Sequence, residues 1–521
     1  MKIKKIKTAL ISVSNKKKIT MMARKLIQKK IKLFATQGTA NILKKKKIKV
    51  TNISDYIQFP EILEGKIKTL HPKIYGGLLA KSSVELNLIK KYKIKKFDLI
   101  IVNFYKLPKK NEKKYLKTIA NYIDIGGPSI IRAAVKNYKK KIIITKIKDY
   151  IKIINHIQHD IYINNNKHLK LAIKAFKYNI SYDMKILNII CKNKKNVDKI
   201  FPKKIKIHLI KQKNLRYGEN KHQKSALYID KKIIKKKPIL FYKQIQGLKL
   251  SYNNISDAEI ACDCVQTIQK FGCVIVKHGN PCGVAIGKNL LQAYKNAYKT
   301  DPISCFGGII ALNEKVNSQT IQYILNKQFL EIIIAPKISN KARNIIKNKK
   351  NIRVLIYKKK RTNILKNELE IRSINGKFLL QTKDNINIDI NTCKFVTYKK
   401  PTKKEIKDLI FAWKIVKFTK SNSVIYVKNL ITTAIGSGQT SRIDAIKVAH
   451  MKAKQLKKNL KKNVLASDAF FPFRDSIDEI ASKKISCIIQ PGGSIRDNEV
   501  IKAANDNNIA MIFTYTRHFK H

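Results

Sequence analysis

Acidic residues are scarce in this chain: 33 Asp and Glu stand against 111 Lys and Arg in 521 residues, a formal net charge of +78. Such an excess normally indicates a polyanionic partner. The lysines, however, are spread along the whole length, without a basic stripe, arm or aromatic-basic module. Because Lys, Ile and Asn share AT-rich codons, biased nucleotide composition is the simpler cause. We therefore expect no specific nucleic-acid partner and keep nucleic-acid binding as a rival function.

Long apolar runs and paired cysteines are also absent. No stretch approaches the length of a membrane span, and no signal-peptide cleavage site follows the lysine-rich start. The eight cysteines form no Cys-x-x-Cys pair, and Cys262 and Cys264 are too close for the usual zinc knuckle. These absences predict a reduced, cytoplasmic protein without a metal.

The chain is too long for one core, so two to four domains are expected. Residues 8–13 read as a strand, followed by a helix over about 18–30 that Ser14 or Asn15 would cap. Residues 31–34 read as a second strand before another helix. Strand-turn-helix repeated twice predicts a parallel α/β sheet with both turns on one edge.

Hydroxyl groups and helix N-termini at that edge suit a phosphate, although a capped helix start explains each turn equally well. The candidate phosphate-binding residues are Ser12, Ser14, Thr36, Gly38 and Thr39.

Further along, a loop with Lys66 and Lys68 precedes His71-Pro72, and a strongly apolar strand over 97–102 ends near Tyr105. Asp124 then stands before a Gly-Gly turn and a helix that carries Lys136. A carboxylate with a lysine on the next helix is a candidate acid/base pair. The alternative is that Asp124 caps the helix and Lys136 is solvated.

The stretch 274–283 combines a buried strand with a cation and an imidazole, Lys277 and His278. We expect Asn280-Pro281 to form the turn, and Gly283 to supply a backbone conformation that other residues avoid. This would place the Lys-His pair at the mouth of a sheet, where α/β enzymes hold their chemistry. The alternative is a strand that ends in an ordinary polar turn.

Two familiar motifs are incomplete. Gly436-Ser437-Gly438 lacks the third glycine and the acidic residue of a dinucleotide fingerprint. Pro281-Cys282-Gly283 near His278 is similar to a nucleotide deaminase, but the zinc signature needs His-x-Glu and Pro-Cys-x-x-Cys. The sequence thus argues against zinc.

In their order, several motifs resemble the PurH family of bifunctional purine biosynthesis enzymes. The cyclohydrolase half is matched by Ser-Val-Ser, Thr-x-Gly-Thr-Ala, Lys-Thr-Leu-His-Pro, Asp-Ile-Gly-Gly and Arg-Ala-Ala-x-Lys-Asn, and the transformylase half by motifs from Leu215-Arg216-Tyr217 to the last residue. The resemblance implies an N-terminal methylglyoxal-synthase-like parallel-sheet domain, residues 1–195. It also implies a C-terminal transformylase region, residues 205–521, of two cytidine-deaminase-like α/β subdomains. A homodimer with sites formed across its interface is implied as well.

For the transformylase, the resemblance implies formyl transfer from 10-formyltetrahydrofolate, a co-substrate, to the 5-amino group of AICAR. His278 matches the base that takes the proton of this weak nucleophile, and Lys277 and Asn422 would stabilise the oxyanion and the leaving group. The AICAR contacts carried over are Arg216, Tyr217, Gly307, Glu331, Asn422, Arg442 and Arg517. The residues expected to hold the folate are Ile443, Phe470, Asp475 and Ser494.

For the cyclohydrolase, the resemblance implies closure of formyl-AICAR to IMP with loss of water. Lys136 matches the proton-transfer lysine, with Asp124, Tyr105 and Lys68 as its partners. Lys66 replaces a substrate-binding arginine of the family and so loses the forked donor. Most departures from the family pattern fall in this half, which leaves open a protein that keeps only the transformylase.

Overall fold

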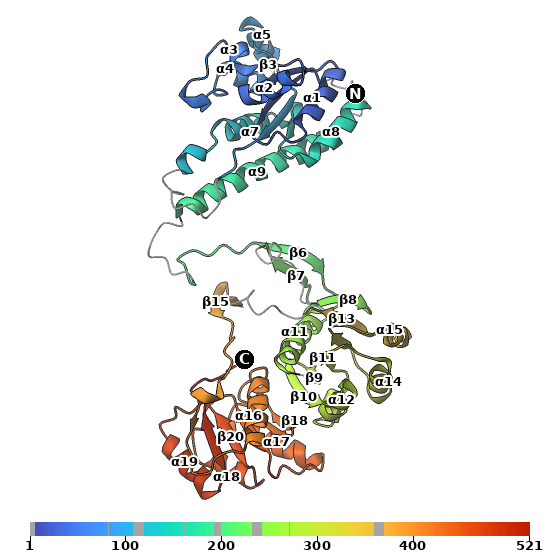
Figure 1. Ribbon diagram of the computed structural model, residues 1–521, viewed down its shortest axis with the longest axis vertical. Coiled ribbons are helices and arrows are strands. Elements are labelled where there is room, and N and C mark those ends of the chain that lie inside the picture. Colours follow the sequence, from blue (N-terminus) through green and yellow to red (C-terminus); the bar gives the residue numbers. More distant parts are fainter. Residues whose placement is uncertain are drawn as a thin grey trace. The chain divides into compact units, whose positions relative to one another are not determined.

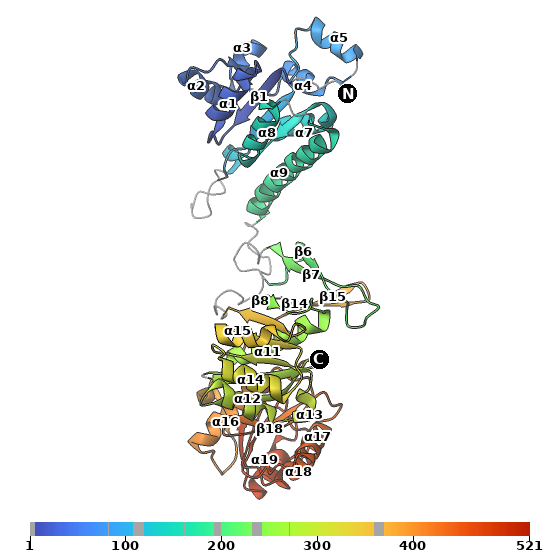
Figure 2. The same cartoon turned by 90° about the vertical axis from the view of Figure 1, so that its right-hand side faces the viewer.

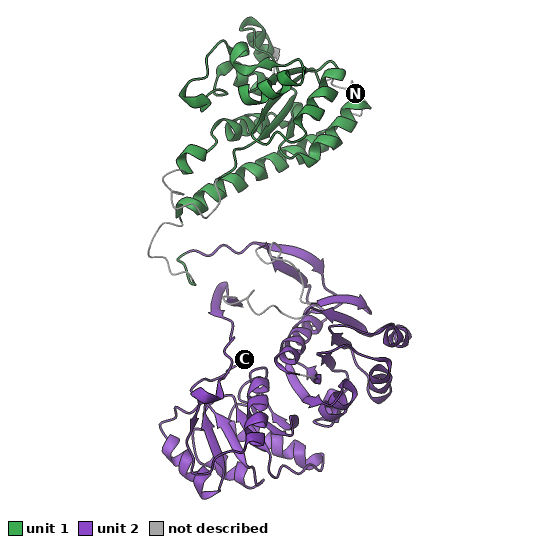
Figure 3. Ribbon diagram, in the orientation of Figure 1, with its two compact units in different colours: residues 1–203 green, residues 204–521 purple. Residues whose placement is uncertain are grey.

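The structure is a computed structural model that describes residues 6–81, 83–107, 119–159, 163–191, 200–231, 242–269, 271–358 and 369–521. The chain divides into two compact units, residues 1–203 and 204–521 (Figure 3). Residue 195, where the first predicted domain ends, lies outside the described residues.

Unit 1 is built on a parallel sheet of order β3-β2-β1-β4-β5. Its strands are β1 (Thr8–Val13), β2 (Lys32–Ala35), β3 (Thr51–Asn52), β4 (Leu99–Asn103) and β5 (Ile142–Ile144). Its helices are α1 (Ile19–Gln28), α2 (Gln37–Lys45), α3 (Ile53–Ile57), η1 (Leu63–Gly65), α4 (Pro72–Leu79), α5 (Ser83–Lys91), η2 (Ala120–Tyr122), α7 (Gly126–Lys136), η3 (Tyr138–Lys140), α8 (Lys148–Gln158) and α9 (Asn165–Cys191).

Alternate residues of the strands of unit 1 pack on opposite faces. Ala9 and Ile11 face a core made with α1, α2 and α8, whereas Leu10 faces a core made with α3, α4, α7 and α9 (Figure 1). Because both faces are covered, the strands are apolar throughout, as parallel strands usually are. The parallel α/β sheet predicted from the sequence is confirmed.

The cap predicted for the first helix is wrong. Helix α1 begins after Lys18, in a left-handed conformation, and no side chain caps it. Instead, the backbone N–H of Asn15 donates to Oδ1 of Asn103 at 2.7 Å. The loop after β1 is thus pinned to the end of β4, which keeps Ser14 and Asn15 away from the helix N-terminus.

Unit 2 is built on a mixed sheet of twelve strands, with two further two-stranded sheets, β6-β7 and β14-β15. Its first half contains β6 (Leu209–Asn214), β7 (Ala226–Asp230), β8 (Tyr242–Gln246), α11 (Tyr252–Thr267), β9 (Phe271–Lys277), β10 (Asn280–Gly287), α12 (Leu290–Tyr298), α13 (Pro302–Cys305), β11 (Ile309–Leu312), α14 (Ser318–Lys327), β12 (Ile332–Ala335), α15 (Asn340–Lys347) and β13 (Arg353–Tyr357). The rest contains β14 (Leu369–Ile374), β15 (Lys377–Thr382), η4 (Ile390–Thr392), β16 (Lys394–Phe395), α16 (Lys403–Val416), β17 (Val424–Lys428), β18 (Ile431–Gly436), α17 (Arg442–Gln455), β19 (Val464–Ser467), α18 (Asp475–Ala481), β20 (Cys487–Gln490), α19 (Asp497–Asp506) and β21 (Ala510–Phe513).

The twelve-stranded sheet contains the same arrangement twice. The strand order β10-β9-β11-β12-β13 of the first half recurs as β18-β17-β19-β20-β21 in the second, and β10 and β18 join the halves. In each half a helix, α11 or α16, precedes the first of these five strands and packs into a core shared by both halves. The opposite face of each half is covered separately, by α12, α14 and α15 or by α17, α18 and α19 (Figure 2). Two α/β subdomains were expected here.

The turn predicted at Asn280-Pro281 is wrong. Strand β9 reverses at His278 and Gly279, whose φ angles are 51° and 79°, and Asn280 already pairs with Lys277 in the antiparallel hairpin. Positive φ at both central residues is the geometry of a tight two-residue hairpin. Gly283 lies inside β10, where a Cβ would stand 2.0 Å from the carbonyl oxygen of Ala297. It is required by the close approach of α12 and not by its own backbone conformation.

None of the helices in the described part of the chain is long and apolar enough to span a membrane.

Candidate active sites

The first candidate site lies where β1 and β2 of unit 1 end. Thr36 is the N-cap of α2, is buried, and makes no capping hydrogen bond with its side chain. Thr39 donates from Oγ1 to the carbonyl of Val13 at 3.3 Å, so its hydroxyl joins the two predicted phosphate loops. Ser12 and Ser14 are partly exposed at the same edge. This edge matches the parallel-sheet site that the sequence predicts.

Lys16 was missed by the sequence analysis. Its Nζ lies 3.8 Å from the position that a Cβ on Gly38 would occupy, which places an ammonium group beside the first turn of α2. A cation next to a helix N-terminus strengthens a site for an anion. No pattern distinguished Lys16 from the many other lysines.

A second group of residues meets at the start of α7. Asp124 accepts from the backbone N–H groups of Gly127 at 2.8 Å and Tyr105 at 3.3 Å. Lys68 is near enough to favour the charged carboxylate, and its Nζ also lies 3.6 Å from Oε2 of Glu61. The structure therefore brings Asp124, Tyr105 and Lys68 together. Burial nevertheless raises the pKa of Asp124, because desolvation outweighs the hydrogen bonds and the lysine.

Lys66 and Lys136 stand apart from this group. Lys66 is exposed and pairs with Glu64, its Nζ lying 3.1 Å from Oε2. Lys136 is exposed at the last residue of α7, whereas Asp124 precedes the first. Ten helical steps separate the ends of α7 by about 15 Å, too far for the two side chains of one chain to meet. The acid/base pair of Asp124 and Lys136 predicted from the sequence is therefore not formed within a single chain.

The third group lies at the tip of the β9–β10 hairpin in unit 2. His278 is exposed at the turn, and Lys277 donates from Nζ to the carbonyl of Phe306 at 2.8 Å, next to Gly307. Strand β9 is antiparallel to both of its neighbours, and its end lies beside the start of β11. The Lys-His pair thus follows the C-terminal end of β9, as expected, and lies beside the amino end of the antiparallel β11.

Glu331 lies at the same edge, before β12. Its Oε2 accepts from Nδ2 of Asn254 at 2.8 Å and lies 3.4 Å from Nη1 of Arg353. Arg216 lies close enough to lower the pKa of Arg353, after the larger effect of burial, and its guanidinium stacks 5.4 Å from the ring of Tyr217. The predicted contacts Arg216, Tyr217 and Glu331 therefore form one cluster. Asn254 and Arg353, which hold Glu331, were not among the predicted site residues.

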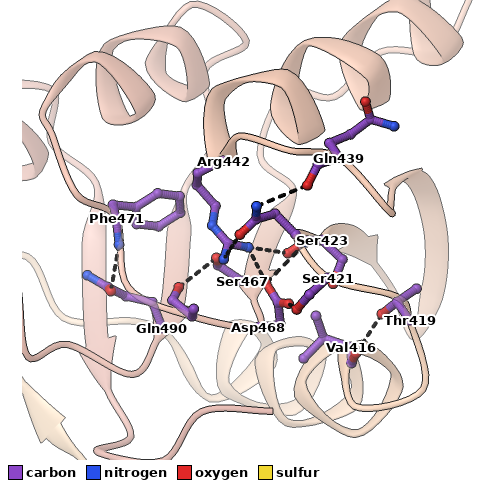
Figure 4. A network of polar contacts seen from close by, with 12 residues as sticks. Val416, Thr419, Ser421, Ser423, Gln439, Arg442, Ser467, Asp468, Phe471 and Gln490 are labelled. Carbon is purple, nitrogen blue, oxygen red and sulfur yellow. Dashed lines mark hydrogen bonds and ion pairs between the residues drawn. The ribbon is translucent and has the colours of Figure 1, made fainter. Parts of the chain in front are cut away.

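In the second half, Asn422 is held by the segment before α17. Its Nδ2 donates to the carbonyls of Gln439 at 3.0 Å and Thr440 at 3.1 Å, and its Oδ1 accepts from Nη2 of Arg442 at 2.8 Å. Arg442 is buried, and its Nη1 donates to the carbonyl of Ser423 and to Asp468 (Figure 4). We expected the two terminal nitrogens of Arg442 to face the substrate. Both donate to protein oxygens instead.

The edges of the two halves meet at the hairpin tip. Oδ1 of Asn280 accepts from the backbone N–H of Lys420 at 2.9 Å, two residues before Asn422. A cavity of about 270 Å³ lies at this junction, lined by Lys277, His278 and Cys282 from the first half and by Ile435, Ser437 and Lys452 from the second. His278 is thus exposed beside a cavity and is not enclosed in apolar packing.

The remaining predicted residues lie in loops and at helix starts on the carboxyl edge of the second half. Arg517 is exposed in the C-terminal segment, next to His518, whose backbone N–H donates to Asp468 at 3.0 Å. The predicted folate residues Ile443, Phe470, Asp475 and Ser494 stand at the starts of α17 and α18 and in the segments after β19 and β20. Across the described ranges, no group of three or more His, Cys, Asp or Glu side chains is placed to hold a metal ion.

Comparison with known proteins gives the family of the chain. A family model described as "AICARFT/IMPCHase bienzyme" matches residues 134–452, and a model of the "MGS-like domain" matches residues 18–129. "Bifunctional purine biosynthesis protein PurH" of Buchnera aphidicola subsp. Acyrthosiphon pisum (strain Tuc7) is 51% identical over 522 residues, and that of subsp. Schizaphis graminum is 49% identical over 523. Both alignments cover 99% of each chain. A solved structure, "Crystal structure of ForH", is 28% identical and covers 35% of this chain and 98% of its own, with a TM-score of 0.33.

The fold and these matches define a bienzyme with an MGS-like domain and a transformylase region. The chain belongs to the PurH family of bifunctional purine biosynthesis proteins, which combine an AICAR formyltransferase with an IMP cyclohydrolase. The resemblance found in the sequence is thus confirmed.

Proposed function

We propose that unit 2 formylates AICAR at the edge that carries His278, and that unit 1 closes the formylated product to IMP at the edge that carries Asp124. The observation that supports this most is the placement of the Lys277-His278 pair. It is exposed beside a cavity whose other wall comes from the second half of unit 2. We place the domain limits near residues 195 and 205, so that each domain carries one of the two reactions.

In the first reaction, the 5-amino nitrogen of AICAR attacks the formyl carbon of 10-formyltetrahydrofolate, the proposed co-substrate. His278 takes the proton of the amine as the new C–N bond forms. The bond between the formyl carbon and N10 then breaks, and a proton goes to N10. Lys277 stabilises the oxyanion, and Asn422, held in place by Arg442, contributes an N–H group when its Nδ2 releases the carbonyl of Gln439 or Thr440. Arg442 thus acts as a positioning residue, whereas Arg216 and Arg517 remain exposed for the substrate.

In the second reaction, the carboxamide nitrogen attacks the formyl carbon, and the tetrahedral intermediate loses water. The nucleotide phosphate binds at Ser12, Ser14 and Thr36, where α2 begins. Asp124 accepts a proton, and Lys68 stabilises the developing oxyanion beside it. The folded-back substrate is held by the loops that also carry Lys66 and Tyr105.

The assignment of Lys136 to proton transfer requires a second copy of the chain. Because Lys136 and Asp124 stand at opposite ends of α7, a partner subunit would have to supply one of them. We therefore propose a homodimer. Its support includes an apolar stripe on α9, where Ile173, Phe176 and Ile180 are 46%, 37% and 49% exposed. Light scattering should give about twice the chain mass of 59.9 kDa.

The experiment that tests the proposal follows both steps with purified protein, AICAR and 10-formyltetrahydrofolate. Formyl-AICAR should appear first and IMP second. Synthetic formyl-AICAR should be converted to IMP without folate. No turnover of synthetic formyl-AICAR, with formylation intact, would favour a chain that keeps only the transformylase.

The rival function, nucleic-acid binding, predicts steep salt-dependent binding to DNA. We propose instead that the positive charge is diffuse, that the partners are small molecules, and that the enzyme works in the cytoplasm. Binding to DNA that weakens by orders of magnitude between low and moderate salt would support the rival.

A further inference from the structure

The hairpin that carries His278 is fastened by a side chain from outside the hairpin. Asp257, on α11, accepts from the backbone N–H of Gly279 at 2.8 Å and also from the backbone N–H of His278. Both turn residues have positive φ, which is costly for a residue other than glycine. A carboxylate that receives both amides offsets this cost and fixes the turn.

The second half of unit 2 contains the same fastening. Asp408, on α16, accepts from the backbone N–H of Asn429 at 2.9 Å and of Leu430 at 2.7 Å. These two residues form the β17–β18 turn, with φ angles of 55° and 59°. The repeated aspartate, helix and hairpin show that the contact is built into the fold and is not an accident of one surface loop.

The two aspartates also occupy the same place on their helices. Asp257 is the sixth residue after the N-cap Ser251, and Asp408 is the sixth after the N-cap Thr402. Each helix begins with a capping box. Only the first half places a histidine in the fastened turn, since the second half has Asn429 there.

We propose that Asp257 is a second positioning residue of the transformylase, which holds the backbone of His278 in the left-handed conformation that aims the imidazole at the substrate. This rests on the proposed role of His278 as the base. The carboxylate acts on the backbone of the histidine, in contrast to a triad aspartate, which holds the ring. Asp408 performs the same structural task in a turn without a catalytic group.

The test compares three variants of the full-length chain in formyl transfer. Asp257→Ala should lower kcat about a hundredfold, because a displacement of about 1 Å in a reacting group has that effect. The KM for AICAR should stay within about twofold, because the clamp touches no substrate. Asp257→Asn keeps an acceptor oxygen and should retain at least about a tenth of the wild-type kcat.

Asp408→Ala is the matched control, since it removes the same kind of clamp elsewhere. It should lower the melting temperature about as much as Asp257→Ala while leaving kcat within about threefold of wild type. The proposal is overturned if Asp257→Ala keeps the wild-type kcat, if Asp257→Asn is as impaired as Asp257→Ala, or if Asp408→Ala loses as much kcat.

One further variant separates this proposal from the proposed function. If His278→Ala still formylates AICAR, the role of the histidine is wrong. If His278→Ala is inactive while Asp257→Ala is fully active, only the positioning role fails. Cyclisation of synthetic formyl-AICAR, assigned to unit 1, should be unchanged in every variant, and the fluorescence of the buried Trp413 reports whether unit 2 has folded.

Discussion

Arg442 donates from Nη2 to the amide oxygen of Asn422 at 2.8 Å, while its Nη1 is held by Asp468 and by the carbonyl of Ser423. The exposed side-chain fractions of the ion pair, 4% for Arg442 and 0% for Asp468, leave little access for solvent. A buried pair of this kind fixes a geometry more than it adds stability. The pair therefore sets the position of the amide that we place next to the formyl group.

Replacing Arg442 by lysine should distinguish its effect on the position of Asn422 from the effect of its positive charge on Asp468. Arg442→Lys keeps a cation for Asp468 but loses the planar fork that also reaches Asn422. We expect kcat for formyl transfer to fall by about tenfold to a hundredfold. Steady-state kinetics would check this.

Arg474→Lys is the control for that change. The ion pair of Arg474 with Asp478 is exposed, with Nε 3.0 Å from Oδ2. Losing the fork of this arginine should therefore leave both activities unchanged. An Arg442→Lys enzyme with wild-type kcat would show that Asn422 does not depend on the arginine.

His278→Ala should abolish formylation and spare ring closure, because the two reactions are assigned to separate units. Asp124→Asn should do the reverse. The two steps are measured separately, with AICAR and folate in one assay and synthetic formyl-AICAR in the other. Equal loss of both activities in either variant would contradict separate sites.

Much of the fold could be predicted from the sequence, because apolar runs bounded by turn residues mark buried strands. Strand β1 was predicted with its observed limits, and α1 to within two residues. The hairpin turn was misplaced because Asn-Pro is a strong turn signal, whereas His278-Gly279 is fastened by Asp257, which is distant in sequence. Local patterns do not reveal such long-range contacts.

The candidate sites were predicted less completely for the same reason. The family resemblance implied that Arg442 contacts the substrate, and nothing in the local pattern ties it to Asp468, 26 residues further on. The separation of Asp124 from Lys136, by contrast, could have been read from the length of the helix between them. The roles of these residues on the substrate stay predictions.

Mixing two inactive variants should test the proposed sharing of Asp124 and Lys136 between subunits. Asp124→Asn and Lys136→Ala should each lose cyclisation. In a mixed dimer, one of the two sites regains both groups, so the purified mixed dimer should show about half of the wild-type activity. The two chains would be co-expressed with different tags, and cyclisation would be assayed in the doubly purified protein. Activity in Lys136→Ala alone, or none after mixing, would contradict a shared site.

Gly283 should be among the glycines least tolerant of substitution. In Gly283→Ala the new Cβ would press on the backbone oxygen of Ala297, which cannot rotate away. We expect the free energy of unfolding to fall by about 3 kcal/mol or more. Gly376→Ala, in an open turn with φ of 77°, should lower the free energy of unfolding by only about 1 kcal/mol.

The measurement uses Trp413, the single tryptophan, which is buried in unit 2, so its fluorescence during urea unfolding reports on this unit.

The pH dependence of ring closure should report the burial of Asp124. Burial raises its pKa, so the carboxylate that accepts a proton is lost at a higher pH than for an exposed aspartate as the solution is acidified. Lys68 opposes this effect, because its ammonium group favours the charged carboxylate. Removing that charge in Lys68→Met should therefore raise the pKa of Asp124 further and move the acidic limb of the pH profile of kcat/KM for formyl-AICAR to higher pH.

Lys66→Met, which removes a lysine paired with Glu64, should leave the position of the limb unchanged even where the rate falls. A limb that moves to lower pH in Lys68→Met would exclude Asp124 as the titrating group, since loss of a neighbouring cation can only disfavour the carboxylate.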